Sequence, residues 1–395
     1  MAKHRILTLN NISSQGLHRF PSAQYTVGKS VDNPDAILVR SHDMHSMAIP
    51  ASVKAIGRAG AGTNNIPVAE MSRRGVPVFN APGANANAVK ELVFAMLLLA
   101  ARNVVPALAY VAGLKPGPDL EQSVEEGKKQ FAGVELTDRT LGIIGLGAVG
   151  SLVADTALKL GMKVIGFDPE ITVDAAWRLP SSVRKADSVE ELLRQSDFVT
   201  LHVPLLGLTR HLIDAKRLAT MKAGAVLLNF ARDAIVDEDA VIAALRAQSL
   251  KYYLCDFPST KLLSEAGVVA LPHLGASTAE AEENCAVMVV DQLRKYLEDG
   301  AMSNAVNFAS VDMPRESPFR VAIANANVPN MLGQISTTMA RAGLNIHNMV
   351  NKSRGEMAYT LVDVDSPIQE VVIRDLAAIE GVLSVRSIPA ANDTA

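Results

Sequence analysis

The stretch Thr140-Leu-Gly-Ile-Ile-Gly-Leu-Gly-Ala-Val-Gly150 decides the fold of this chain. An apolar run leads into Gly145, Gly147 and Gly150, which have the spacing G-x-G-x-x-G. The first glycine permits a tight turn after a strand, the second lets the backbone approach a pyrophosphate, and the third lets the next helix pack closely on the sheet. The amino end of that helix offers free N–H groups and a positive dipole to phosphates. This stretch predicts a strand, a turn and a helix that together bind a dinucleotide.

An acidic residue at the expected distance supports this interpretation. The second apolar run, Lys163-Val-Ile-Gly-Phe-Asp168, ends 18 residues after Gly150. A carboxylate at the end of that strand accepts hydrogen bonds from ribose hydroxyls and repels a 2′-phosphate, which favours NAD over NADP. Glycine turns are common in proteins, so the alternative is an α/β turn that binds nothing.

Length and composition limit the class of protein. The 395 residues predict two or three domains, and 49% hydrophobic residues are ample for buried cores. The net charge of −3 comes without a long basic run, so neither nucleic acid nor a membrane surface is expected as a partner. The two cysteines, Cys255 and Cys285, lack metal-binding spacing, so we expect no metal and a reducing compartment. With no signal peptide and no long apolar stretch, we expect a cytoplasmic protein.

Strand-like and helix-like patterns alternate regularly between residues 141 and 273. Six strands of a doubly wound parallel sheet are predicted at residues 141–145, 163–168, 197–202, 225–230, 252–257 and 268–273. Ligands bind beyond the carboxyl ends of such strands. The residues that end these runs therefore carry most weight: Asp168, His202, Arg232, Asp256 and His273.

The flanking segments predict two further modules. Before the glycine turn, strands are predicted at 5–9, 36–40, 53–57 and 76–79, then a buried helix at 86–104 and an exposed connection at 115–130. A long helix is predicted at 276–300, and residues 312–318 have the composition of a linker. The tail has strands at 319–325, 344–350, 357–364 and 382–388, with helices at 329–342 and 368–379. That order, βαββαβ, is typical of a ferredoxin-like module.

Three of the strand-end residues suggest chemistry. Arg232 presents a fork of donors that matches a carboxylate, although an arginine in a surface turn is the alternative. His273 is placed as a general acid or base, although most isolated histidines are structural. Asp256 could orient the amide of the nicotinamide or stabilise a nearby positive charge, or it could simply cap a loop.

Several stretches of the chain resemble the D-2-hydroxyacid dehydrogenases, and within them the phosphoglycerate dehydrogenase branch. They are residues 57–66, 79–92, 201–204, 229–232 and 272–278, in the order found in that family. The tail resembles an ACT domain, a small-ligand sensor, which favours the phosphoglycerate branch. The resemblance implies an α/β fold with two Rossmann-like or flavodoxin-like lobes of doubly wound parallel sheet, plus the ACT domain. The implied boundaries are 1–85 with 276–312 for the substrate lobe, 86–275 for the NAD lobe and 318–395 for the ACT domain.

The resemblance also implies an enzyme that oxidises 3-phospho-D-glycerate to 3-phosphohydroxypyruvate with NAD, the first step of serine biosynthesis. In it, His273 takes the hydroxyl proton and Arg232 holds the substrate carboxylate. Positions matching family contacts to NAD are Gly145, Gly147, Ala148, Val149, Gly150, Asp168, His202, Val203, Pro204, Asn229, Phe230, Ala231, Arg232, Asp256, His273 and Gly275. Positions matching substrate contacts are Arg58, Ala59, Gly60, Asn85, Arg232 and His273.

Two departures from the family pattern stand out. The family's histidine is paired with a glutamate that would fall at Thr260 or Lys261, where this chain has no acid. We expect His273 to work without a carboxylate partner, unless Glu265 reaches it through a loop of different shape. Asp233 replaces the usual glycine after Arg232; aspartate tolerates a left-handed backbone, but its charge could compete for that of Arg232.

The resemblance leaves regulation and substrate open. Effector contacts are implied for Asn325, Asn327 and Asn345, with L-serine as the ligand, although the tail could serve only in oligomerisation. A homodimer or homotetramer is expected. The alternatives are a dehydrogenase or reductase for another D-2-hydroxy acid, distinguished by phosphate-binding residues around Arg40 and Arg58, or a weakly catalytic NAD(H)-binding sensor.

Overall fold

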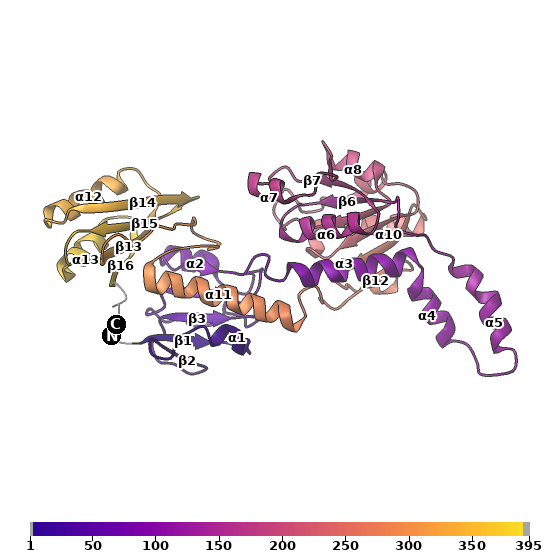
Figure 1. Ribbon diagram of the computed structural model, residues 1–395, viewed down its shortest axis with the longest axis horizontal. Coiled ribbons are helices and arrows are strands. Elements are labelled where there is room, and N and C mark those ends of the chain that lie inside the picture. The colour runs from indigo at the N-terminus through magenta and orange to yellow at the C-terminus, as the bar shows by residue number, and fades with distance from the viewer. Residues whose placement is uncertain (1–2, 390–395) are drawn as a thin grey trace. The chain divides into compact units, whose positions relative to one another are not determined.

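The computed structural model describes residues 3–389, which form three β-sheets (Figure 1). The chain divides into two compact units. One contains the residues up to Asn85 together with those from Ala279 onward, and the other contains Ala86–Thr278. The last six residues of the predicted ACT domain, 390–395, lie outside the described residues.

The second unit is built on a seven-stranded parallel sheet with the order β12-β11-β10-β9-β6-β7-β8. The strands are β6 Thr140–Ile144, β7 Lys163–Phe167, β8 Arg184–Lys185, β9 Phe198–Leu201, β10 Ala225–Asn229, β11 Leu250–Cys255 and β12 Val268–Ala270. The strand order reverses between β6 and β9, so the switch point at which such folds bind ligands lies at the end of β6. The short strand β8 was not predicted.

Helices cover both faces of this sheet. Leu141 and Ile143 of β6 pack in a core with α3 (Ala86–Ala101) and α6 (Ala148–Lys159). Ile144 belongs to the core on the other face, under α8 (Val189–Gln195), α9 (Ala215–Leu218) and α10 (Glu238–Arg246). This alternation follows from the two-residue period of a strand, and burial on both faces explains the continuous apolar runs.

A helical arm leaves α3 in the second unit. It consists of α4 (Val104–Ala112), α5 (Leu120–Gly127) and a 3-10 turn at Lys128–Phe131, so the predicted exposed connection at 115–130 is in part helical. No residue of α4 is buried, and Leu108 and Val111 are 64% and 58% exposed. Within residues 3–389 no single helix is long and apolar enough to cross a bilayer; only α3 and α4 together meet that measure, as a pair bent by 66°.

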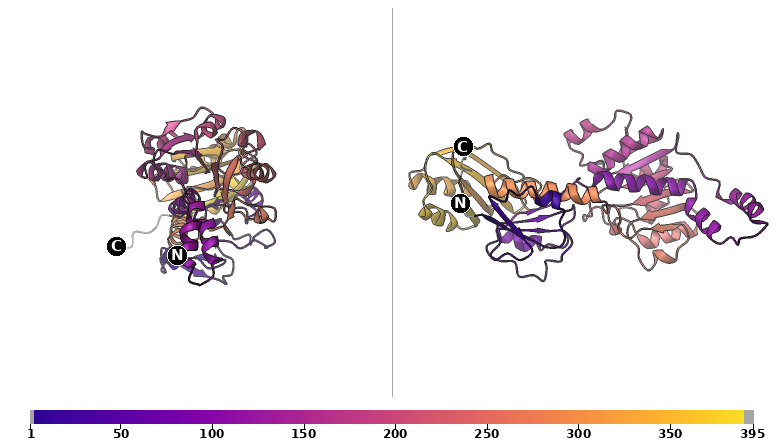
Figure 2. Two further views of the ribbon diagram at one scale, coloured as in Figure 1. Left: turned by 90° about the vertical axis from the view of Figure 1, so that its right-hand side faces the viewer. Right: turned by 60° about the horizontal axis from the view of Figure 1, so that its bottom comes forward.

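The first unit contains a five-stranded parallel sheet and the long helix α11 (Ala279–Asp299) (Figure 2). The strands are β1 His4–Thr8, β2 Tyr25–Gly28, β3 Ala36–Val39, β4 Ala55–Arg58 and β5 Val78–Phe79, in the order β2-β1-β3-β4-β5. This is the flavodoxin-like order. Shorter helices are α1 (Ser14–Leu17), which packs on α11, and α2 (Val68–Arg73). The edge strand β2 was missed because it is short and only half-buried.

The tail of the first unit is a βαββαβ module with a four-stranded antiparallel sheet ordered β14-β15-β13-β16. Its elements are β13 Phe319–Ala326, α12 Met331–Arg341, β14 Ile346–Arg354, β15 Met357–Val364, α13 Glu370–Ala377 and β16 Val382–Pro389. The predicted fold class, two doubly wound parallel sheets and an ACT-like module, is confirmed.

The face of this module that lies away from its helices packs on the rest of the first unit. Ala322 and Ala324 share a hydrophobic core with Tyr296 of α11, while Val321 and Ile323 face α12 and α13. The Arg386 guanidinium lies 4.3 Å from the ring centre of Tyr296.

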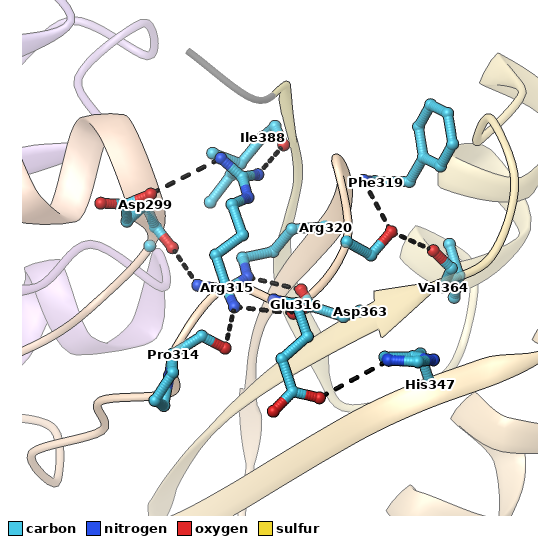
Figure 3. A network of polar contacts seen from close by, with 12 residues as sticks. Asp299, Pro314, Arg315, Glu316, Phe319, Arg320, His347, Asp363, Val364 and Ile388 are labelled. Atoms are coloured by element: carbon cyan, nitrogen blue, oxygen red, sulfur yellow. Dashed lines mark hydrogen bonds and ion pairs between the residues drawn. The ribbon is translucent and has the colours of Figure 1, made fainter. Parts of the chain in front are cut away.

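Buried arginine contacts hold the carboxyl end of α11 against the tail (Figure 3). Arg320 donates to both oxygens of Asp363, at 2.6 and 2.8 Å, and the two side chains are 1% and 0% exposed. Arg320 also donates to the carbonyl oxygen of Asp299 at 3.1 Å. Tyr359 donates to the carbonyl oxygen of Gly300, and Arg386 donates to those of Tyr296 and Leu297. These side chains satisfy the carbonyl groups that a helix leaves unpaired at its end.

Candidate active site

The glycine turn lies at the carboxyl end of β6, next to the switch point. Gly145 has φ +92°, and a Cβ there would lie 2.5 Å from the carbonyl oxygen of His202. A Cβ on Gly150 would lie 2.0 Å from the carbonyl oxygen of Gly145. The fold itself therefore requires glycine at both positions.

Gly147 has a different role in the same turn. A Cβ at this position would meet no atom within 4 Å, so protein packing does not demand glycine there. Gly147 precedes α6, and no side chain caps the amino end of that helix. An open approach to uncapped N–H groups fits a pyrophosphate, for which those groups would be the donors.

Asp168 is held next to this turn by two backbone groups. Its Oδ2 accepts a hydrogen bond from the N–H of Leu146 at 2.8 Å, and its Oδ1 accepts one from the N–H of Glu170 at 3.0 Å. Each carboxylate oxygen keeps a second acceptor site. The position at the end of β7 and the negative charge fit a ribose without a 2′-phosphate.

His202 closes the turn from the end of β9. Its N–H donates to the carbonyl oxygen of Ile144 at 2.7 Å, and its Nε2 lies 3.0 Å from the hydroxyl of Thr200. Burial lowers the pKa of His202 to about 3, so the imidazole is neutral near pH 7. The following Val203 is partly buried and Pro204 is exposed.

Arg232 follows β10 and is held by a buried asparagine. Asn229 is 0% exposed, and its side-chain amide donates to the carbonyl oxygen of Arg232 at 2.8 Å. The Arg232 side chain is exposed, and it forms no ion pair within residues 3–389. Asp233 does not compete for it and does not adopt a left-handed backbone; it begins a 3-10 turn that ends at Ile235.

His273 is exposed and has a left-handed backbone, with φ +57°. That conformation is unfavourable for a residue other than glycine and persists only where its surroundings enforce it. Asp256, 1% exposed, enforces it: its two oxygens accept hydrogen bonds from the N–H groups of Leu274 and Gly275, both at 2.7 Å. The ring of Phe257 meets the imidazole edge to face, with 5.2 Å between ring centres.

These contacts show that Asp256 caps the loop that carries His273. Its own N–H donates to the carbonyl oxygen of Asn229 at 3.3 Å. Asn229 and Asp256 thus form one buried link from the backbone of Arg232 to the loop that carries His273. The structure brings the two predicted catalytic residues into one hydrogen-bonded framework.

The two residues considered for a carboxylate partner of His273 have other partners. Lys261 is exposed, and its ammonium group pairs with Asp239 at 2.6 Å. Glu265 accepts both of its hydrogen bonds from the guanidinium of Arg246, so it does not turn toward the histidine. Among the described residues, no acidic side chain pairs with His273.

Four of the predicted substrate residues lie in the first unit, whereas Arg232 and His273 lie in the second. Arg58 ends β4 and donates from Nε to the carbonyl oxygen of Arg40 at 3.1 Å. Its guanidinium covers Gly60, where a Cβ would lie 2.3 Å from Nη1, and Ala59 beside it is buried. Arg58, Ala59 and Gly60 therefore form one loop, whereas Asn85 is the last residue before the second unit.

Comparison with known proteins then identifies the family. Residues 94–275 match the model for the NAD-binding domain of D-isomer specific 2-hydroxyacid dehydrogenases. The chain is 33% identical over 348 residues to the D-3-phosphoglycerate dehydrogenase of Haemophilus influenzae, covering 84% of this chain and 80% of that protein. The chain belongs to the D-2-hydroxyacid dehydrogenase family. As the glycine turn and Asp168 predicted, this dehydrogenase is an NAD-dependent enzyme.

Other relatives differ in length and in the activity they are named for. The D-3-phosphoglycerate dehydrogenase of Methanocaldococcus jannaschii is 34% identical over 345 residues, covering 85% of this dehydrogenase but only 63% of that protein, less than two thirds of its length. The hydroxypyruvate reductase of Thermotoga maritima is 36% identical over 284 residues, covering 68% of this dehydrogenase and 87% of that protein. The solved structure of NAD+-bound 3-phosphoglycerate dehydrogenase from Entamoeba histolytica has a TM-score of 0.60 and 26% identity. The match covers 77% of this dehydrogenase and 99% of that structure.

The structure of this dehydrogenase separates the three predicted effector residues. Asn325 and Asn327 lie at the end of β13, where it pairs with the start of β15. Asn345 precedes β14, and it contacts Asp365, just after the end of β15. The carbonyl oxygen of Asn345 accepts a hydrogen bond from the N–H of Asp365, and the N–H of Asn345 donates to the side-chain Oδ1 of Asp365. Asn345 therefore lies at the opposite end of the sheet, and one module does not unite the three. The match to family positions gave no strand register, so it could not reveal this.

Proposed function

We propose that this dehydrogenase oxidises 3-phospho-D-glycerate to 3-phosphohydroxypyruvate. The observation that carries the proposal is the buried Asn229–Asp256 link, which holds Arg232 and the His273 loop in one framework. The named activity of two relatives at 33–34% identity supports the choice of substrate.

In this proposal the glycine turn, Asp168 and the ends of β9 and β10 hold NAD. The bound NAD supplies the acceptor for the two electrons and the hydrogen that leave C2 of the substrate. The exposed guanidinium of Arg232 binds the substrate carboxylate, because its donor fork has no competing ion pair. His273 takes the proton of the C2 hydroxyl at one ring nitrogen. The substrate phosphate is assigned to the Arg58 loop.

The lack of a carboxylate partner changes what orients the histidine. In this chain the position of His273 follows from the loop anchored by Asp256 and from contact with Phe257. The same lack keeps the weakly catalytic sensor as an alternative. Turnover with NAD and a hydroxy acid separates the two.

A reductase or dehydrogenase for an unphosphorylated hydroxy acid is the second candidate. The observation in its favour is the ion pair of Arg40 with Glu282 at 2.5 Å, which engages one of the two arginines expected near the phosphate. The named activity of the Thermotoga maritima relative is of this kind.

The test is a direct assay of purified protein. NADH absorbance is followed with NAD and 3-phosphoglycerate at alkaline pH, with hydrazine to trap the keto acid, and D-glycerate is assayed in parallel. The proposal expects a higher kcat/KM for the phosphorylated acid and losses of about 10² to 10⁴ in His273→Ala. Faster turnover of D-glycerate overturns the substrate assignment.

We further propose L-serine as an effector of a paired assembly. The side-chain oxygen of Asn325 is buried and has no hydrogen-bond partner among the described residues, so it could accept from a ligand ammonium group. Because Asn345 lies at the other end of the sheet, a site using all three asparagines requires two modules. The helix α4 is apolar but has no buried residue, so a second copy of the chain could cover it, which supports a homodimer as well. Serine inhibition that Asn325→Ala abolishes, without a change in mass by light scattering, is the expected result.

A further inference from the structure

A basic cavity lies at the amino edge of the seven-stranded sheet. It is open to solvent, has a volume of about 600 Å³, and is lined by the starts of β6, β7 and β8, the ends of α6 and α8, and the turn before β10. Because β6 is five residues long, this edge lies about 15 Å from the glycine turn at the other end of the strand. The cavity is thus distinct from the cofactor turn.

Four cationic side chains from four separate segments converge on this cavity. They are Lys163, Arg184, Arg194 and Lys222, and no carboxylate is among the lining residues. Arg194 lies in the last turn of α8, where a cation also offsets the helix dipole. The other three come from strands or a turn, so helix capping does not explain them.

The two arginines have no acidic partner within the described part of the chain. Lys163 and Lys222 each pair with an aspartate, Asp138 and Asp197, that does not line this cavity. Arg184 instead donates to the neutral amide oxygen of Gln195 at 3.0 Å, and no ion pair is formed by Arg194. Two guanidinium charges therefore remain without a counter-charge.

The Arg184 guanidinium is held in place by a relay of side chains. Gln195, whose oxygen accepts from Arg184, donates from its amide nitrogen to Glu191 at 3.0 Å. Glu191 in turn accepts from the N–H of Asp187 at 2.8 Å. Such support lowers the entropy lost when a donor fork engages a ligand. A guanidinium held this way matches a phosphate bidentately.

Apolar side chains also line the cavity, and a second basic cavity adjoins it. Leu158, Met162, Val164 and Ile165 supply apolar side chains next to the cations. The neighbouring cavity of about 190 Å³ shares Lys222 and adds Arg139 and Lys251. Asp197, the one carboxylate lining it, already accepts from Thr140 and Lys222.

We propose that this cavity binds a phosphate-bearing ligand of the nucleotide class. In this proposal the apolar part of the lining takes the base, the two arginines take the phosphates, and the lysines add long-range attraction. The volume is within the range of small-ligand sites. The inference does not depend on which hydroxy acid this dehydrogenase oxidises.

The test uses ATP as the probe, with the cofactor site saturated by NADH. Binding to the full-length protein is measured by equilibrium dialysis, without divalent metal. We expect saturable binding of one ATP per chain, weakened at least about tenfold in the double variant Arg184→Ala/Arg194→Ala, since hydrogen bonds to charged groups are the stronger ones. Inorganic pyrophosphate, which lacks the base, should bind at least about tenfold more weakly than ATP.

Lys185→Ala is the matched control. Lys185 is adjacent to Arg184 on β8 but pairs with Asp187 and does not line the cavity, so its loss should leave ATP binding unchanged. Equal unfolding midpoints show that all variants fold. No saturable ATP binding in NADH-saturated protein, equal binding by the double variant, or pyrophosphate as tight as ATP would each overturn the proposal.

Discussion

At the scale of single residues, the position of His273 follows from a side chain buried beneath it. A left-handed histidine costs about 1–3 kcal/mol and needs a constraint to persist. The two backbone N–H groups that follow His273 both donate to Asp256, which supplies that constraint. Asp256 thus fixes the position of His273 through the backbone, without contacting the imidazole ring.

Replacement of Asp256 by asparagine should loosen this loop. The amide would place a donor against a backbone N–H, and a buried hydrogen bond lost in this way costs about 1–3 kcal/mol. We expect faster hydrogen–deuterium exchange at Leu274 and Gly275 and a fall of kcat by about tenfold to a hundredfold. Unchanged exchange at these two residues would contradict the assigned role.

His202 predicts a pH dependence of stability. Its pKa is lowered to about 3 by burial, whereas the unfolded chain has an ordinary histidine of about 6.5. The unfolded state therefore binds the proton first, and the free energy of unfolding falls as pH drops below about 6.5, by up to about 1.4 kcal/mol per pH unit. Urea unfolding at pH 7, 6 and 5 should show that the free energy of unfolding falls more steeply with decreasing pH in the unaltered protein than in His202→Gln. Parallel curves would contradict this explanation.

At the scale of elements, the glycines in the turn between β6 and α6 have two different roles, one in packing and one in binding. Gly145 and Gly150 are required by backbone contacts, whereas Gly147 has open space where a side chain would be. The spacing of glycines alone shows that three are present. Only the contacts of each Cβ position show which of them serve the fold.

Two alanine substitutions test this division. Gly150→Ala brings Cβ against the carbonyl oxygen of Gly145, so we expect a loss of about 1–3 kcal/mol in unfolding free energy. Gly147→Ala, with φ −70°, should keep the unfolding midpoint but raise the NADH dissociation constant at least about tenfold. Fluorescence titration and thermal unfolding measure the two effects. Tight NADH binding by Gly147→Ala would show that no phosphate approaches there.

Most elements could be predicted from the sequence because their signals are local. Buried parallel strands are apolar runs, and the tail alternates strand and helix patterns clearly. Three of the missed elements gave no such signal: β2 is a half-buried edge strand, β8 has only two residues, and α5 is a charged helix. The partners of Asp256 and Glu265, and the distance of Asn345 from Asn325, follow from loop shape and strand register, which residue patterns do not encode.

At the scale of the whole molecule, the tail module shares the core of the first unit. The buried pair Arg320–Asp363 has further partners, since Arg320 also donates to the carbonyl oxygens of Asp299 and Pro314. The pair therefore connects the module to the end of α11 and to the linker (Figure 3). We infer that the module and α11 unfold together.

Asp363→Ala should reveal that shared stability. Removal of one partner leaves a buried guanidinium unpaired, which costs about 3–5 kcal/mol. In calorimetry we expect the transition of the first unit to shift to lower temperature, while NADH binding by the second unit is retained. The double variant Arg320→Met/Asp363→Leu should recover only part of the loss, because the carbonyl groups of Asp299 and Pro314 stay unpaired. A transition that does not move would contradict the shared core.

The arginine-capped end of α11 has a consequence for truncated forms of this protein. A protein that ends at residue 312 would expose Tyr296 and Phe308 to water as an aggregation-prone apolar patch. It would also leave carbonyl groups at the end of α11 without their arginine caps. Such a truncation should be recovered mainly as inclusion bodies. The ACT-like tail of this dehydrogenase therefore does not form an independent accessory domain, and transferring it to another enzyme would require transferring α11 as well.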